Sequence, residues 1–439
     1  MDLGLISFLM ASFLLILIFM GLPITFCLIS TATVFTTIFW GFSKLTILVS
    51  STFGTMVNPT FLAVPLFIFM AHILQSTGIT DDLFDTIWKW LGGVPGGLAI
   101  ASIASITLLD AMTGVGATGI FTIGMIAYPQ MRDRGYDKTL AIGPIAPASA
   151  LGPLIPPSNI MIILGGFASL SVGALFMAGV IPGLLISVGF VSYILIRCLI
   201  NPKLAPIIPV EERPNFREKI FATKNVILPV LLVVAVLGGI WTGVTTAIEG
   251  AGLGAFGAMV CALIKKKLTL SNLKNSALIT LRSNVMIMWL MVGGSCYASF
   301  MSASGMSQYL GNLLLGMPLP PIGIIGVLVL ILLLLGMFID SVAIIMITVP
   351  IFFPIVKALG FDPIWFATIF TIAIVIGYIT PPFGYNLFYL RALIPVGEVS
   401  TKMLYRSVLP YGPIMLIVLL ICLFFPEMVL FIPKWFIGF

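Results

Sequence analysis

The amino-acid sequence predicts an all-α polytopic membrane protein made of two related halves. Three observations indicate this fold class. Of the 439 residues, 60% are hydrophobic and only 8% are charged, whereas soluble domains carry about 25% charged residues. Apolar runs of about 20 residues, the length that crosses a bilayer, recur along the chain. Two proline motifs, GPLIPPSN at 152–159 and GYITPPFGYN at 377–386, interrupt such runs in nearly the same way.

The apolar runs predict the membrane-spanning helices in chain order. Strands of a membrane barrel would instead give alternating segments of about ten residues. The chain starts with MDLG, which lacks a basic residue, so we expect the first run to be a retained helix and not a signal peptide. The clearest runs are Leu3–Met20, Phe61–Leu74, Ser169–Leu199, Val226–Thr242, Gly250–Ile264, Gly323–Phe338 and Tyr411–Phe425.

Two basic loops predict the orientation. They are Asn201–Asn225 and Lys265–Asn275, and the two apolar runs between them are joined by a tight corner at Trp241-Thr242-Gly243. A pair of helices returns the chain to the side it left, so both loops lie on one side. The positive-inside rule makes that side cytoplasmic. The net charge of +6 does not imply a nucleic-acid partner.

Few residues could carry enzymatic chemistry, and we do not expect an enzyme. The five cysteines are scattered without metal-ligand spacing. The single histidine, His72, lies in an apolar run, where a packed or interfacial imidazole is favoured over a proton relay. No nucleotide loop or catalytic triad is visible, and a channel would need several spans with repeated polar residues lining a pore.

An internal repeat relates the two proline motifs. The offset is 225 residues between the motifs (381 − 156) and is the same for three flanking pairs; for an earlier glycine pair it is 227. The pairs are Pro129/Pro354, Gly135/Gly360, Asp137/Asp362 and Gly78/Gly305. We therefore predict a first repeat over 1–200, a cytoplasmic connector over 201–225 and, over 226–439, a second repeat plus a C-terminal helix. By analogy with other transporters, such halves have inverted topology with substrate at their interface.

Each half has the same internal order. An apolar stretch comes first and is interrupted by a corner, at 111–116 or 336–340. A polar connection follows, which contains the paired proline, glycine and aspartate. A second apolar stretch comes last and is broken at the double prolines. The first stretch predicts two half-membrane helices folded as a re-entrant hairpin whose tip meets the break. Proline removes a backbone donor, and unpaired carbonyls in hydrocarbon need another partner. Sodium is such a partner, and the hydroxyl and amide side chains nearest the breaks are Ser158, Asn159, Thr380 and Asn386.

Two acidic residues lie beside the corners, Asp110 and Asp340. Charge within a span is a functional hypothesis by default. For Asp340, coupling of an ion or proton and capping of the helix that starts at Ser341 remain open alternatives; for Asp110 coupling is less favoured. Glu249 precedes a glycine-rich helix suited to close packing, and we assign it a scaffold role.

Several motifs resemble the large membrane subunit of TRAP transporters, the tripartite ATP-independent periplasmic transporters of the dicarboxylate and sialic acid type. The resemblance covers nearly the whole chain. Its motifs are TGVGATGIFTIG (113–124), PQMRDRGYDKTLAIG (129–143), ALGPLIPPSNIMIILGG (150–166), GVTTAIEGAGLGAFGA (243–258), GMFIDSVAIIMITVPIFFPIVKALGFDP (336–363) and GYITPPFGYNLFYL (377–390).

This resemblance implies an inverted repeat with two re-entrant hairpins and two broken helices, working as an elevator-type symporter. It implies sodium as the coupling ion, no organic cofactor, and import of an organic acid across the bacterial inner membrane. The implied partners, besides the lipid bilayer, are a small four-helix membrane subunit and a periplasmic substrate-binding protein. A stand-alone sodium/carboxylate symporter on the same architecture is the alternative.

Site residues follow from the resemblance by position. The implied first sodium site is Thr113, Gly114, Gly152, Pro156, Ser158 and Asn159. The implied second site is Gly336, Asp340, Gly377, Thr380, Pro381 and Asn386. The implied substrate contacts are Thr113, Pro157, Ser158 and Pro382.

The chain departs from its relatives in three places. Many of them carry serines after the first-tip glycine, an Asn and a Glu before the second proline motif, and Pro-Thr before Glu249. The corresponding stretches here are Gly114–Gly116, Thr371–Ile376 and Ala247-Ile248.

Overall fold

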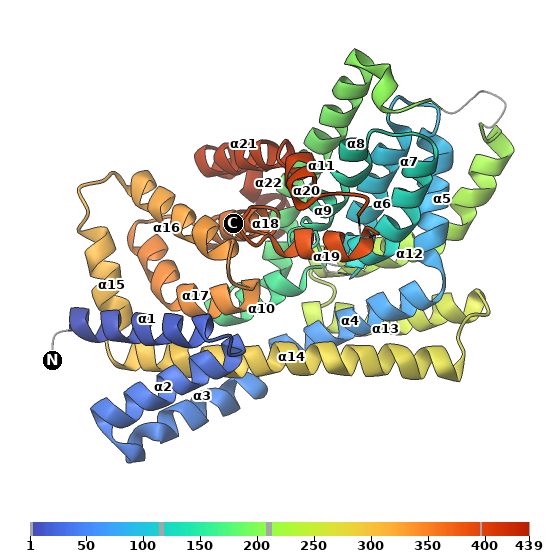
Figure 1. Ribbon diagram of the computed structural model, residues 1–439. Helices are drawn as coiled ribbons and strands as arrows, with labels where there is room; N and C mark the ends of the chain where they lie inside the picture. Colours follow the sequence, from blue (N-terminus) through green and yellow to red (C-terminus); the bar gives the residue numbers. More distant parts are fainter. Residues whose placement is uncertain (1–2, 114–117, 208–212, 396, 439) are drawn as a thin grey trace.

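A computed structural model describes residues 3–113, 118–207, 213–395 and 397–438 (Figure 1). All regular elements within these ranges are helices. Seven helical segments are long and apolar enough to cross a membrane, as judged by length and composition. They are Pro59–Ser76, Val172–Ile200, Phe216–Trp241, Ala247–Ile264, Leu270–Ala303, Ser341–Ala358 and Thr401–Phe424. The predicted all-α polytopic fold is confirmed.

A framework of helices is built around one long helix. Its central member is α14 (Leu270–Ala303), whose 34 residues correspond to about 50 Å. Figure 1 shows α14 crossing the whole molecule, with α1, α2 and α3 near one end and α4 and α13 toward the other. The remaining members are α1 (Leu3–Phe19), α2 (Ile24–Trp40), η1 (Phe42–Leu45), α3 (Thr46–Met56), η2 (Pro59–Leu62), α4 (Ala63–Ser76), α12 (Phe216–Trp241) and α13 (Ala247–Ile264).

The expected connector between the halves is partly helical. Helix α12 begins at Phe216, inside the segment predicted as a polar loop over 201–225. The reason is a capping box, in which Asn215 and Glu218 satisfy each other's backbone N–H groups at 2.9 and 3.1 Å. The tight corner at Trp241-Thr242-Gly243 is present, with Gly243 at φ 74°.

Two sets of short helices contain the predicted hairpins and broken helices. In the first half, α5 precedes a hairpin of α6, the π-helix η3 and α7; the broken helix α8–α9–α10 and the long α11 follow. Their bounds are α5 (Ile79–Leu91), α6 (Gly97–Thr113), η3 (Ile120–Gly124), α7 (Met125–Asp133), α8 (Lys138–Ile142), α9 (Ile145–Ser149), α10 (Asn159–Ala168) and α11 (Val172–Ile200), with η4 (Pro202–Leu204) after them.

The second half repeats this order. Helix α15 precedes a hairpin of α16 and α17, and the broken helix α18–α19 comes next, followed by three C-terminal helices. The bounds are α15 (Met306–Leu315), α16 (Pro321–Gly336), α17 (Ser341–Ala358), α18 (Pro363–Gly377), α19 (Tyr385–Leu393), α20 (Thr401–Val408), α21 (Tyr411–Phe424) and α22 (Pro426–Ile437).

Residues paired by the sequence offset adopt the same local conformation. Gly78 and Gly305 are left-handed, at φ 75° and 76°, directly before α5 and α15. Asp137 and Asp362 both cap helices, accepting hydrogen bonds from backbone N–H groups two residues later at 3.0 and 2.7 Å. The peptide bonds Pro156–Pro157 and Pro381–Pro382 are both cis. The repeat is therefore structural as well as sequential.

The two hairpins enter from opposite sides of the membrane. At the base of the first, an added Cβ on Gly96 would lie 2.8 Å from the sulfur of Cys198, near the end of α11 and the cytoplasmic connector. The base of the second follows α14, which starts beside the lysines at 265–267 and crosses the bilayer once. The halves thus have inverted topology, as expected.

Each broken helix contacts both hairpins. Its first part packs on the hairpin of its own half, α9 on α6 and α18 on α16. Its second part packs on the opposite hairpin, α10 on α17 and α19 on η3. The two breaks consequently lie at the centre of an interlocked body.

The loop after α19 is held at the cytoplasmic base of the first hairpin. Glu398 accepts hydrogen bonds from the Tyr128 hydroxyl at 2.6 Å and from Arg132 at 3.0 Å. The Tyr128 hydrogen bond and the Arg132 charge hold the pKa of Glu398 below its usual value. These contacts place the start of α20 beside the base of the first hairpin.

Candidate functional site

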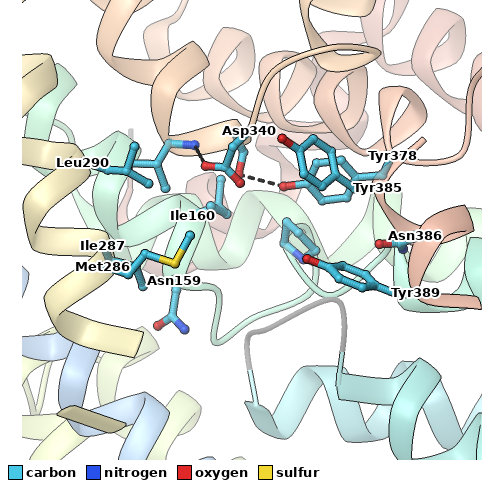
Figure 2. Close-up of a pocket in the computed structure, with 13 residues that line it drawn as sticks. Asn159, Ile160, Met286, Ile287, Leu290, Asp340, Tyr378, Tyr385, Asn386 and Tyr389 are labelled. Carbon is cyan, nitrogen blue, oxygen red and sulfur yellow. Dashed lines mark hydrogen bonds between the residues drawn. The ribbon is translucent and has the colours of Figure 1, made fainter. Parts of the chain in front are cut away.

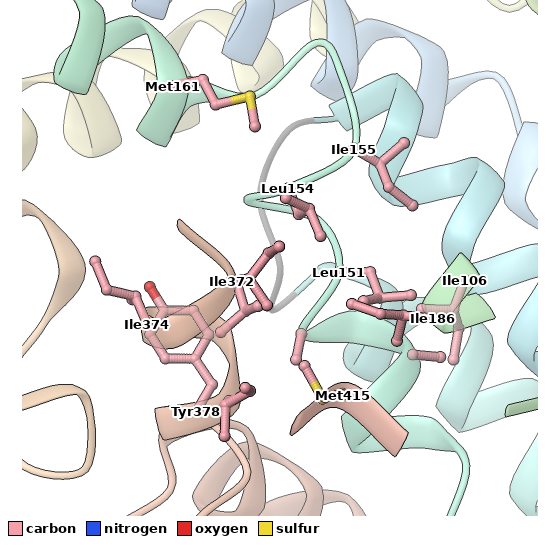
Figure 3. Close-up of a cluster of buried hydrophobic side chains, with 14 of the residues drawn as sticks. Ile106, Leu151, Leu154, Ile155, Met161, Ile186, Ile372, Ile374, Tyr378 and Met415 are labelled. Atoms are coloured by element: carbon pink, nitrogen blue, oxygen red, sulfur yellow. The ribbon is translucent and has the colours of Figure 1, made fainter. Parts of the chain in front are cut away.

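The first break is a buried loop closed by a serine. The Ser158 hydroxyl donates to the carbonyl of Pro153 and accepts a hydrogen bond from the Met161 N–H at 3.2 Å. Gly179 of α11 lets the loop pack closely, because a Cβ there would lie 2.3 Å from the Leu154 carbonyl oxygen. Figure 3 shows the loop surrounded by apolar side chains from several helices.

Asn159, the first residue of α10, presents an unpaired amide. Its side chain is only 4% exposed, and neither its oxygen nor its nitrogen has a hydrogen-bond partner among the described residues. A buried polar group without a partner costs about 1–3 kcal/mol, so this amide is suited to a ligand. Gly152, Pro156 and Pro157 are buried beside it.

The tip of the first hairpin lies mostly outside the description. Helix α6 ends at Thr113, and Gly114 is not among the described residues. The expected contacts of Thr113 and Gly114 with the first break therefore stay predictions.

The second tip is joined to its break by two glycines. A Cβ added to Gly377 would lie 2.4 Å from the carbonyl carbon and 2.7 Å from the Cα of Gly336. The ends of α16 and α18 are therefore in backbone contact, a distance only glycine permits. The expected apposition of these two residues is present.

Asp340 caps α17 at the second tip. Its Oδ1 accepts a hydrogen bond from the Val342 N–H at 2.9 Å, so the capping alternative is confirmed geometrically. The neighbouring Ser341 hydroxyl accepts a hydrogen bond from the Tyr378 hydroxyl at 2.7 Å, which ties the second break to the tip. Ion coupling by Asp340 remains a prediction, because an N-cap carboxylate can also hold a cation.

The second break differs from the first in exposure. Thr380 is half-buried, and its hydroxyl donates to the Ile376 carbonyl at 2.6 Å within its own helical turn. Pro381 and Pro382 are exposed, and the Tyr405 hydroxyl donates to the Pro382 carbonyl at 3.0 Å. Equivalent prolines thus have unlike surroundings in the two halves.

Asn386 links the halves. It is 2% exposed, and its Nδ2 donates to the carbonyl oxygen of Ala146 in α9 at 3.0 Å. Its backbone N–H donates to the Tyr378 carbonyl at 3.1 Å across the second break. The residue expected in the second cluster therefore also contacts the first broken helix.

A cavity of about 190 Å³ lies between the two halves. Figure 2 shows Asn159 from the first break, Asp340 from the second tip and Asn386 from the second broken helix around it. Part of α14 closes one side. The apolar and aromatic lining residues are Pro153, Ile160, Met286, Ile287, Leu290, Val342, Tyr378, Tyr385 and Tyr389. Pro157, Ser158 and Pro382, expected to touch substrate, are not in this lining.

Comparison with known families decides the class of protein. Residues 11–428 match the family described as "Tripartite ATP-independent periplasmic transporter, DctM component". The chain belongs to this transporter family. The predicted resemblance is confirmed, and a multi-pass protein of the bacterial inner membrane follows from it.

Two relatives of this TRAP permease are similar over most of their length. One is the C4-dicarboxylate TRAP transporter large permease protein DctM of Pseudomonas aeruginosa, 32% identical over 87% of this chain and 88% of that protein. The other is the sialic acid TRAP transporter large permease protein SiaM of Vibrio cholerae, 30% identical over 96% of this chain and 97% of that protein.

A solved structure supports the fold of the TRAP permease. The crystal structure of the Alcanivorax borkumensis YdaH transporter superposes with a TM-score of 0.66, covering 88% of this chain and 89% of that one at 16% identity. At this identity the likeness concerns the fold alone.

Three tyrosines of the TRAP permease site were missed by sequence reasoning. Tyr378 and Tyr385 lie inside the second proline motif, and Tyr389 follows one helical turn later on the same face of α19. Their position in the motif was an available signal. A helix break interpreted as a cation site predicts ligands with small oxygen-bearing side chains, and this prediction does not include aromatic hydroxyls.

Asp110 is buried beneath the first tip. It is fully buried, and both carboxylate oxygens lack a hydrogen-bond partner among the described residues. A Cβ on Gly119 would lie 3.2 Å from its Oδ1, so the acid faces the second arm of the same hairpin. The Ser149 hydroxyl on α9, which packs against α6, is the side chain that neighbours this carboxylate, and it has no other hydrogen-bond partner among the described residues. A role for Asp110 in coupling stays a prediction.

Proposed function

We propose that this TRAP permease is the large subunit of a sodium-coupled symporter that imports an organic acid. The relatives described above are named for C4-dicarboxylates and for sialic acid, both of which are organic acids. In this proposal residues 1–200 are the first repeat, 226–439 are the second repeat plus a C-terminal helix, and 201–225 connects the two on the cytoplasmic side. A small four-helix membrane subunit and a periplasmic substrate-binding protein complete the transporter.

The observation that carries the proposal is the cavity between the halves. Two helices begin at its wall, α10 at Asn159 and α17 at Ser341. Helix N-termini carry partial positive charge, which favours a carboxylate. The Asn386 amide and the tyrosine hydroxyls add further polar groups. The cavity is therefore our proposed place for the acid.

Sodium is proposed at the two breaks. The first site comprises Thr113, Gly114, Gly152, Pro156, Ser158 and Asn159, and the second Gly336, Asp340, Gly377, Thr380, Pro381 and Asn386. The unpaired Asn159 amide and the Asp340 carboxylate support this assignment, since sodium in broken-helix sites is held by oxygen atoms. The interlocked hairpins and broken helices also support an elevator mechanism, in which they move as one body against the α14 framework.

Reconstitution tests the proposed function. In proteoliposomes that contain both membrane subunits, with the binding protein outside, uptake of the ligand of that binding protein should require an inward sodium gradient. Replacing sodium with potassium should abolish uptake. Uptake by this chain alone would overturn the tripartite arrangement and favour a stand-alone carboxylate symporter. Equal uptake under a proton gradient without sodium would overturn sodium coupling.

Alanine substitutions at the breaks test the ion sites. Asn159→Ala removes no hydrogen bond present in the structure, so stability should be retained while half-saturation by sodium rises roughly tenfold, equivalent to about 1.4 kcal/mol. Thr380→Ala should raise it too. Thr371→Ala is the matched control for Thr380→Ala, because the Thr371 hydroxyl makes the same kind of bond within its turn, to the Ala367 carbonyl at 2.8 Å, and Thr371 belongs to neither proposed sodium site. Unchanged sodium activation in both variants would remove the assignment.

A further inference from the structure

A second cavity opens beside the second hairpin, and one end of it reaches Thr380 and Pro381 of the proposed second sodium site. It has a volume of about 600 Å³ and lies between α16, α18, α20 and α21. Its walls are mainly aliphatic, with Leu333, Met337, Ile376, Leu409 and Leu416 among them. An empty apolar space of this size would forfeit many dispersion contacts, so in a membrane we expect it to be filled.

Two basic side chains stand at one end of this cavity. Lys402 and Arg406 lie four residues apart on α20, on the same side of the helix, and both are exposed. Within the described ranges neither has a hydrogen bond or ion pair. The opposite side of α20 is buried through Leu404 and Val408. The helix is therefore amphipathic, with an unneutralised pair of positive charges facing outward.

The same two residues also line a neighbouring polar cavity of about 620 Å³. Arg197, near the end of α11, is in its wall together with Asp137 and Thr139. The Arg197 guanidinium donates to the Thr139 hydroxyl at 3.1 Å and lies 4.0 Å from Asp137. The two cavities thus share a boundary made of positive charge.

The depth of the apolar cavity in the membrane follows from its neighbours. Arg197 precedes the cytoplasmic connector by one helical turn, which puts the basic end near the cytoplasmic surface. At the other end are Met337, at the second hairpin tip, and Thr380 and Pro381, at the second break. The cavity therefore runs from the cytoplasmic headgroup level toward the middle of the bilayer.

We propose that this cavity binds an anionic phospholipid of the cytoplasmic leaflet. The phosphate of the headgroup lies against Lys402 and Arg406, with Arg197 adding positive charge, and an acyl chain fills the apolar space. Basic pockets between membrane helices on the cytoplasmic side suit such headgroups. The acyl chain then packs against Thr380 and Pro381, so the lipid supports the exposed side of the second break.

Lipid binding to the purified full chain tests the proposal. The probes are phosphatidylglycerol and phosphatidylethanolamine with identical acyl chains, and native mass spectrometry gives the affinity for the first lipid bound. The wild-type chain should prefer phosphatidylglycerol. The double variant Lys402→Gln/Arg406→Gln should bind it about thirtyfold more weakly, since two contributions on the order of 1 kcal/mol each are lost and each tenfold corresponds to about 1.4 kcal/mol. Binding of phosphatidylethanolamine should be unaffected.

A cavity-filling variant tests the acyl-chain part separately. Gly412 lines the cavity, and a Cβ there meets no atom within 4 Å. Gly412→Leu should therefore fold normally and weaken binding of both lipids. Gly326→Leu is its matched control, because Gly326 lies on α16 with equally open surroundings and outside the cavity. Lys274→Gln/Arg282→Gln, on the exposed face of α14, controls for loss of charge.

Three outcomes would overturn the proposal. The first is equal affinity for the two lipids in the wild-type chain. The second is phosphatidylglycerol binding that survives Gly412→Leu unchanged. The third is displacement of the lipid by a second copy of the chain or by a membrane partner, which would make this cavity a protein interface. If the charge variant fails to fold, Gly412→Leu still tests whether a lipid occupies the cavity, and the comparison of the two lipids in the wild-type chain still tests the preference for an anionic headgroup.

Discussion

Replacing Gly377 with alanine is expected to abolish transport and to destabilise the protein. The added Cβ would lie 2.4 Å from the carbonyl carbon of Gly336 and 2.6 Å from its oxygen. These are backbone atoms, so no side chain can rotate away, and α16 and α18 must separate. Overpacking commonly costs about 1–3 kcal/mol, and here it also displaces the second tip. Thermal unfolding in detergent and uptake in proteoliposomes measure the two effects.

Two glycines on α16, Gly326 and Gly336, give graded comparisons for the substitution of Gly377 on α18. Gly326→Ala meets no atom within 4 Å and should leave both stability and uptake near wild type. Gly336→Ala places its Cβ 3.3 Å from the Ile374 carbonyl oxygen, a smaller overlap that should give an intermediate loss. Wild-type uptake in Gly377→Ala would show that close contact between tip and break is not needed for transport.

Replacing Asp340 separates its two possible roles. Asn caps helices about as well as Asp, so Asp340→Asn should keep the hydrogen bond from Val342 and unfold at nearly the wild-type temperature. It removes a negative charge, and at an effective dielectric of 20 a unit charge about 4 Å from a cation contributes about 4 kcal/mol. Half-saturation by sodium should therefore rise at least about tenfold.

Asp340→Ala loses both the cap and the charge. It should show the same sodium defect together with a loss of about 1 kcal/mol in the free energy of unfolding. Sodium-dependent uptake and thermal unfolding, measured on the same preparations, distinguish the variants. Wild-type sodium dependence in Asp340→Asn would reduce Asp340 to a capping residue.

Most of the fold could be predicted from the sequence, because its signals are local. Apolar length predicts spans, and glycine and aspartate at fixed offsets predict left-handed turns and helix caps, as at Gly135/Gly360 and Asp137/Asp362. The early start of α12 was not predicted, because the capping box at Asn215 begins a helix within a polar segment.

The site was less predictable because its contacts are long-range. Asn386 and Ala146 are 240 residues apart, and nothing near either residue indicates that they meet. The stretch Thr371–Ile376 is buried, and the Thr371 hydroxyl donates to the Ala367 carbonyl within its own helix. Polar groups at the second site come from Asp340, Ser341 and Tyr378, and the Tyr378 hydroxyl donates to the Ser341 hydroxyl across 37 residues of sequence.

The crossed packing of the broken helices bears on how tightly transport is coupled. Because α10 rests on α17 and α19 rests on η3, neither hairpin can swing open without disturbing a helix that belongs to the other half. The hydrogen bond between Asn386 and Ala146 adds a polar tie across the same junction. Such an arrangement penalises half-open states, through which ions would slip without cargo. We expect it to suppress dissipation of the ion gradient as much as it shapes the binding site.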